Sequence, residues 1–134
     1  MNIQLLDWKV NELSYNLHSK KSEEGNSFNL STGHSFSEEK DNEFYIGFKI
    51  EVNDESFDLI MESSFRFEVS DGITEDFKLS DFPKINAPAI AFPFLRAFIS
   101  NFTLQSGVDP VILPSINFVR LAEQSGQDQL SISP

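Results

Sequence analysis

The chain has 134 residues, of which 40% are apolar and 23% charged, as expected for a single soluble globular domain. It contains no Cys, which excludes disulfides, thiolate chemistry and cysteine-based zinc sites. The net charge of −11 lies in residues 1–81, while residues 82–134 are neutral, and a field of this sign repels nucleic acid. No apolar run approaches the roughly 18 residues of a membrane span, and no export signal is evident. We therefore expect a cytoplasmic protein without membrane insertion.

Two strands are expected in the first 36 residues. A long first strand has apolar residues on even positions from Leu6 to Val10 and on odd positions from Leu13 to Leu17. This change of parity predicts a bulge near Asn11-Glu12. A weaker alternation predicts a second strand over residues 27–36.

The clearest alternation belongs to a hairpin with strands over about residues 43–53 and 56–70. The polar residues between them favour a turn centred on Asp54-Glu55. Opposed residues then have numbers that sum to 109, so Val52 faces Phe57. This register places the apolar side chains of both strands on one face of the sheet.

A helix is expected after the strands, because apolar residues recur every three or four positions between residues 88 and 105. Pro93 removes a backbone donor, which predicts a break around Phe92-Pro93, and Gly107 lies beyond the helix end.

The C-terminal part should begin with an apolar loop over residues 107–114, in which two prolines prevent a helix. A short second helix is expected over about 116–125. The predicted organisation is one domain over residues 1–126 and an unstructured, flexible tail over 127–134.

Sites for catalysis, metals or cofactors are not indicated. His18 and His34 lie in loop or alternating stretches without a supporting motif. The acidic pairs lack the spacing of a calcium loop, and no glycine fingerprint for phosphate is present. We expect no enzymatic activity, no metal and no cofactor.

The 14 Phe residues allow two interpretations. They could all fill the core, or some could serve an oligomer interface or an apolar binding groove, because one sheet and two helices cover limited aromatic area.

One stretch resembles a known family. The sequence Phe-Pro-Phe-Leu-Arg at 92–96 is followed by Gly107, Pro110, Leu113-Pro114 and Ile116-Asn117-Phe118. Its spacing is similar to the C-terminal signature of the SecB export chaperones, and the order of strands and helices over about residues 3–125 is compatible with that family.

The resemblance implies an α+β fold in which a four-stranded antiparallel sheet is followed by two helices. It further implies a homotetramer built as a dimer of dimers. The implied function is ATP-independent binding of unfolded or precursor polypeptides for export, with transfer to the SecA motor on the outer face of the sheet. It places the contacts with that partner at Glu12, Ile60 and Glu62.

The client-binding site is expected around the apolar loop. A loop normally runs over the surface, so Val111, Ile112 and Leu113 either seal the core or present an apolar face. The residues expected to bind clients are Phe28, Leu30, Ile112, Phe118 and Leu121.

Three alternatives remain open. Relatives with this fold also act as solitary chaperones, for example for an antitoxin-type client. A small apolar-ligand carrier would need an enclosed cavity with a few convergent polar groups. A purely structural subunit is the third possibility.

Overall fold

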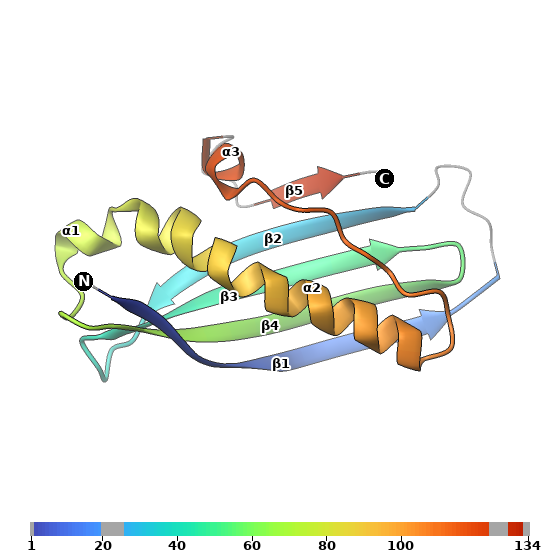
Figure 1. The fold of residues 1–134 in the computed structure, drawn as a ribbon, viewed down its shortest axis with the longest axis horizontal. Coiled ribbons are helices and arrows are strands. Elements are labelled where there is room, and N and C mark those ends of the chain that lie inside the picture. Colours follow the sequence, from blue (N-terminus) through green and yellow to red (C-terminus); the bar gives the residue numbers. More distant parts are fainter. Residues whose placement is uncertain (1, 20–25, 124–128, 133–134) are drawn as a thin grey trace.

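The computed structural model describes residues 2–19, 26–123 and 129–132. Its elements are β1 (Ile3–Leu17), β2 (Ser27–Phe36), β3 (Glu43–Asn53), β4 (Phe57–Val69), α1 (Glu75–Lys78), the π-helical turn η1 (Phe82–Asn86), α2 (Ala87–Gln105), α3 (Phe118–Glu123) and β5 (Gln129–Ile132). The strands form one antiparallel sheet in the order β1-β4-β3-β2-β5. Figure 1 shows α2 crossing one face of the sheet diagonally, and the chain after α2 returning toward α3. The predicted α+β fold is confirmed.

The hairpin of β3 and β4 forms as predicted, but its predicted register is wrong by two residues. Opposed residues have numbers that sum to 111, so Val52 faces Leu59 and Asn53 faces Asp58. The turn is centred one residue further along the chain than expected, on Glu55-Ser56: the backbone N–H of Asp54 donates to the carbonyl of Phe57 at 2.9 Å. A slip of two residues leaves every side chain on its face, which is why the alternation could not detect it.

The first strand contains two irregularities. The pairing of β1 with β4 shifts between Val10 and Glu12, which confirms the bulge predicted near Asn11-Glu12. A second shift lies between Leu5 and Asp7 and was not predicted. The first shift keeps Leu5 and Trp8 on the same face, and the second keeps Trp8 and Leu13 on that face, although the positions in each pair differ in parity.

The core fills the space between α2 and the covered face of the sheet. Trp8 stacks on Phe65 with ring centroids 4.9 Å apart, and the ring of Phe98 from α2 packs perpendicular to that of Trp8. Of the 14 Phe side chains, nine are buried, four are half-buried and only Phe94 is exposed. Most of the Phe surplus is therefore accounted for by the core.

The helix α2 is continuous through Pro93, so the predicted break at Phe92-Pro93 is wrong. Buried Phe92 and Leu95 flank the proline and hold both halves of the helix against the core, which compensates for one lost backbone hydrogen bond. The helix ends before Gly107, as predicted, and that glycine has a φ of 97°.

The continuous helical stretch of residues 82–105 is long and apolar enough to cross a bilayer by length and composition alone. The sequence criterion of an unbroken apolar run missed it, because such a run is a narrower test than mean hydropathy. In this fold, the stretch buries Ala91, Leu95 and Ile99 in the domain core. That the chain does not insert into membranes stays a prediction.

The C-terminal region differs from the expectation. Residues 129–132 form β5, which pairs with β2, so the predicted lack of structure is wrong for this segment. Unpaired N–H and C=O groups at the edge of β2 explain why a short extended segment can dock there. The second helix covers residues 118–123; positions 124–125, the expected domain boundary at 126 and the rest of the tail lie outside the described residues.

Candidate functional site

A hollow of about 360 Å³ lies where the segment after α2 passes the end of the β3–β4 hairpin and the start of β2. Phe28, Val52 and the apolar residues of segment 110–114 contribute to its lining. Acidic side chains come from the turn, at Asp54 and Glu55, and from Asp109. Among the residues that the structure describes, the lining contains no Lys or Arg, so this part of the hollow combines apolar walls with negative charge.

The segment that borders this hollow is fixed by Thr103, which is fully buried near the end of α2. The Thr103 hydroxyl donates to the carbonyl of Ile99 at 2.8 Å and accepts from the backbone N–H of Val111 at 2.9 Å. The N–H of Val108 donates to the Thr103 carbonyl. These bonds hold the loop in one conformation against the helix end.

A further polar contact joins the end of α2 to the sheet. The Tyr15 hydroxyl of β1 lies 2.8 Å from that of Ser106, and the Ser106 hydroxyl also donates to the Thr103 carbonyl. Sequence reasoning did not identify Thr103 or Ser106 as positioning residues. The one available signal was the presence of hydroxyl side chains at the end of an apolar helix, where they bond to nearby backbone groups.

Two consecutive loop residues point in opposite directions. Leu113 is 2% exposed and belongs to the core, whereas Ile112 is 72% exposed. The sequence left open whether this loop seals the core or presents an apolar face, and in the structure it does both. Leu113 seals the core, and Ile112 presents an apolar side chain beside the hollow.

The five residues expected to bind clients differ in their exposure to solvent. Phe28 and Leu30 on β2 and Phe118 and Leu121 on α3 are buried, and Phe118 packs on the rings of Phe48 and Phe92. Among the five, Ile112 alone is exposed, and Phe28 and Ile112 line the same hollow. Sequence reasoning considered the acidic loop pairs only as calcium ligands and did not connect Asp54, Glu55 or Asp109 with an apolar site.

The uncovered face of the sheet carries alternating polar residues of β1, β3 and β4. Glu12 lies directly opposite Glu62, and Glu62 lies opposite Lys49 on its other side. Ile60, 43% exposed, is in the next row, opposite Ser14. The three residues expected to contact a partner therefore come together on one surface, which we call the outer face.

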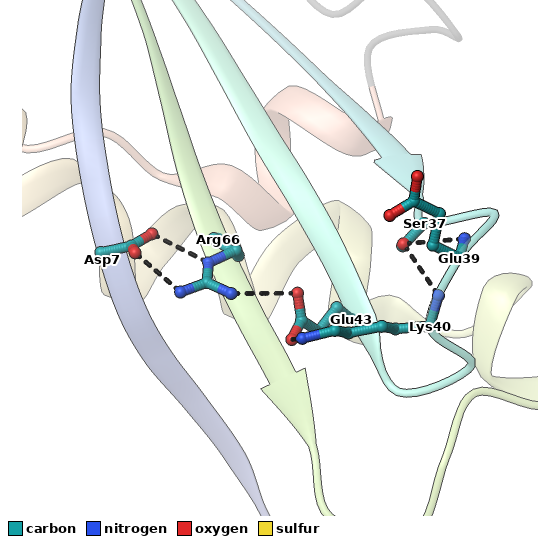
Figure 2. A network of polar contacts seen from close by, with 6 residues as sticks. All are labelled: Asp7, Ser37, Glu39, Lys40, Glu43 and Arg66. Atoms are coloured by element: carbon teal, nitrogen blue, oxygen red, sulfur yellow. Dashed lines mark hydrogen bonds and ion pairs between the residues drawn. The ribbon is translucent and has the colours of Figure 1, made fainter.

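An ion-pair network crosses the outer face (Figure 2). The guanidinium of Arg66 on β4 donates to both carboxylate oxygens of Asp7 on β1, at 3.1 and 2.8 Å. It also donates to Glu43 on β3 at 3.2 Å, and Lys40 lies 3.4 Å from the same carboxylate. The hydrogen bonds that Arg66 donates lower the pKa of Asp7, and the same bonds to the carboxylates of Asp7 and Glu43 raise the pKa of Arg66.

No group of three His, Asp or Glu side chains within the described part of the chain comes together in a way that could hold a metal ion. The Nε2 atom of His18 lies 3.3 Å from a carboxylate oxygen of Asp58 near the turn between β3 and β4. This pair joins the end of β1 to β4, and we assign it no chemical role.

Solved structures with this arrangement of sheet and helices are similar to the chain. The SecB-like chaperone Rv1957 of Mycobacterium tuberculosis, in complex with a ChAD peptide from the HigA1 antitoxin Rv1956, has a TM-score of 0.63 at 14% identity. That match covers 85% of this chain and 90% of the other. A protein of unknown function from Streptococcus agalactiae has a TM-score of 0.55 at 14% identity, with 86% and 98% covered. The fold is thus SecB-like.

Sequence comparison identifies the family. The model of the family described as preprotein translocase subunit SecB matches residues 14–129, so the chain belongs to the SecB family. An uncharacterized protein, MJ0357 of Methanocaldococcus jannaschii, is 50% identical over 40 residues, which is 30% of this chain and 26% of that protein. Membership of the SecB family supports a chaperone role.

Proposed function

We propose that this protein is an ATP-independent chaperone that binds unfolded polypeptides at the hollow beside Ile112. The observation that carries the proposal is the 72% exposure of Ile112 on a loop that Thr103 holds in place. Exposing a large aliphatic side chain to water is unfavourable, and a fixed loop provides an apolar contact without first being ordered. The chain needs neither turnover nor a cofactor for this activity.

The negative charge of the hollow favours clients with basic residues. Asp54, Glu55 and Asp109 favour segments in which Lys or Arg flanks apolar residues. Apolar contacts tolerate many sequences, so the charge selects among clients more than the shape of any one side chain does. Acidic segments of equal hydropathy should bind more weakly, and added salt should reduce the difference.

Replacing Ile112 by Ser tests the site. Because Ile112 is exposed, the free energy of unfolding should change by less than about 0.5 kcal/mol, while suppression of aggregation of a reduced, unfolded client should be lost. Leu113→Ser is the matched control: it should cost about 2 to 4 kcal/mol in stability because it removes buried volume and adds a hydroxyl. Normal client holding by Ile112→Ser would reject the site.

The rival function is a carrier of a small apolar ligand in the same hollow. A carrier would bind a fluorescent fatty acid or a similar probe with one-to-one stoichiometry and would leave an unfolded protein to aggregate. The chaperone should give the opposite pair of results, so measuring both activities on one preparation separates the two functions.

The identity of the client system is part of the proposal. The similar Rv1957 structure contains an antitoxin peptide, which supports a polypeptide as the client class. We propose that the protein acts in the cytoplasm on export precursors, with transfer to a SecA-type motor through Glu12, Ile60 and Glu62. A solitary chaperone for an antitoxin-type client would bind polypeptide equally well but would show no association with the motor.

We propose that the chain forms a homotetramer. The outward side of α2 exposes Ile90, Phe94 and Leu104, at 42, 48 and 55%, although the same helix covers the core on its other side. β1 is an edge strand of the sheet and has backbone groups free to pair with a second copy. A stable monomer in light scattering at micromolar concentration would overturn this assembly.

A further inference from the structure

The C-terminal strand of the chain occupies the edge of β2. Residues 129–132 pair antiparallel with Phe28–Ser31, with Ser131 opposite Asn29 and Gln129 opposite Ser31. Within the described residues, β2 is paired with β3 along its full length, whereas β5 covers only part of its second edge. Residues 32–36 of β2 thus continue beyond the docked segment.

This docking is weak on physical grounds. A four-residue edge strand offers few backbone hydrogen bonds, and each contributes about 1 kcal/mol net in water. Short strands of this kind are marginally stable unless several of them combine. β5 is therefore an element that can leave the sheet without unfolding the core, whose described residues come from β1–β4, the helices and the loop before α3.

The edge that β5 covers adjoins the proposed client site. Ser27 and Phe28 line the hollow beside Ile112, and Phe28 is also the residue opposite Ile132 at the end of β5. An extended polypeptide that leaves the hollow along β2 would enter the place of β5. Pairing of backbone groups does not depend on side-chain identity, so an open edge is suited to sequence-tolerant binding.

We propose that β5 is an internal competitor of the client: it occupies the β2 edge when the chaperone is empty and is displaced when an extended polypeptide pairs with that edge. The inference rests on the proposed chaperone function. Apparent client affinity then equals the intrinsic affinity multiplied by the fraction of molecules in which the edge is free.

Locking β5 onto β2 is the first test. The chain contains no Cys, so a Ser31→Cys and Gln129→Cys double variant has only the introduced thiols. Directly opposed residues of an antiparallel pair have Cα atoms about 4.5 to 5.5 Å apart, within the range for a disulfide. The oxidised variant should bind a carboxymethylated, permanently unfolded polypeptide at least about tenfold more weakly than the same variant after reduction. Ser31→Cys alone is the control for oxidation.

Releasing β5 is the second test. Only alternate residues of an edge strand donate their backbone N–H to the neighbouring strand, so one of the two consecutive residues Leu130 and Ser131 donates to β2 and the other does not. Leu130→Pro and Ser131→Pro are therefore made separately in the full chain, and one of the two variants loses a hydrogen bond to β2. The variant that loses this donor should bind the polypeptide about fivefold more tightly, without a change in the main unfolding transition. The other proline variant, which keeps all hydrogen bonds to β2, is the matched control.

The outcomes separate this inference from the proposed function. If the natural chain binds the unfolded polypeptide and neither oxidation nor proline changes the affinity, β5 is not a competitor, while the chaperone function stands. If oxidation strengthens binding, β5 is part of the client site and the inference is overturned. If neither the natural chain nor any variant binds, the proposed function itself fails. Weaker binding on locking together with tighter binding on release supports the inference.

Discussion

The two faces of the sheet come from the same strands but are stabilised by different interactions. The covered face buries Phe44, Phe65 and Phe67 completely, together with aliphatic neighbours. The outer face holds seven acidic side chains and three basic ones: Asp7, Glu12, Glu43, Glu51, Asp58, Glu62 and Glu68, with Lys9, Lys49 and Arg66. Burial is non-directional and scales with area, whereas charge pairing at a surface depends on geometry and salt. Stability should thus depend mainly on the covered face, and recognition of charged partners on the outer face.

Removing an aromatic ring from the covered face should have the largest effect. Phe65 is fully buried, stacks on Trp8 and packs edge-on against Phe48. Phe65→Ala should lower the free energy of unfolding by about 3 to 5 kcal/mol in a urea titration. Ile60→Ala on the outer face of the same strand is the matched control and should cost less than about 1 kcal/mol. Equal costs would contradict the division between the faces.

Acid should remove the stability that the pair of Asp7 and Arg66 on the outer face contributes to the fold. Arg66 lowers the folded-state pKa of Asp7 below its ordinary value, so this pair stabilises the fold above the unfolded pKa of about 3.9. Its contribution should be lost as pH falls below about 4, through the folded pKa. In thermal unfolding from pH 7 to pH 2, Asp7→Asn should therefore lose less stability than the natural chain. An identical pH profile would show that the pair contributes nothing.

Reversing one charge on the outer face should have the smallest effect on the fold. Glu62 is half-buried between Glu12 and Lys49, and Glu62→Lys should change the free energy of unfolding by less than about 0.5 kcal/mol. Association with a basic partner should slow at low salt, because surface charges mainly set encounter rates. Ser64→Ala in the same strand is the neutral control. An unchanged association rate with a SecA-type motor would argue against this docking surface.

The sequence determined which side chains share a face, because the two-residue period of a strand assigns each residue to one side. The four long strands, the bulge near Asn11-Glu12 and the end of α2 before Gly107 all followed from such local patterns. The signature over residues 92–118 likewise identified the family, because its spacing lies within one stretch of chain.

Tertiary structure decided the features that depend on contacts between distant residues. Alternation cannot distinguish registers that differ by two, so the Val52–Leu59 pairing required the actual turn. Neighbouring Ile112 and Leu113 are equally apolar in sequence, and only the bond from Val111 to Thr103 and the position of the core direct Leu113 inward. The docking of β5 likewise depends on a free edge of β2, about 100 residues earlier in the chain. Backbone groups at that edge are the same for every residue type, so no local pattern could predict it.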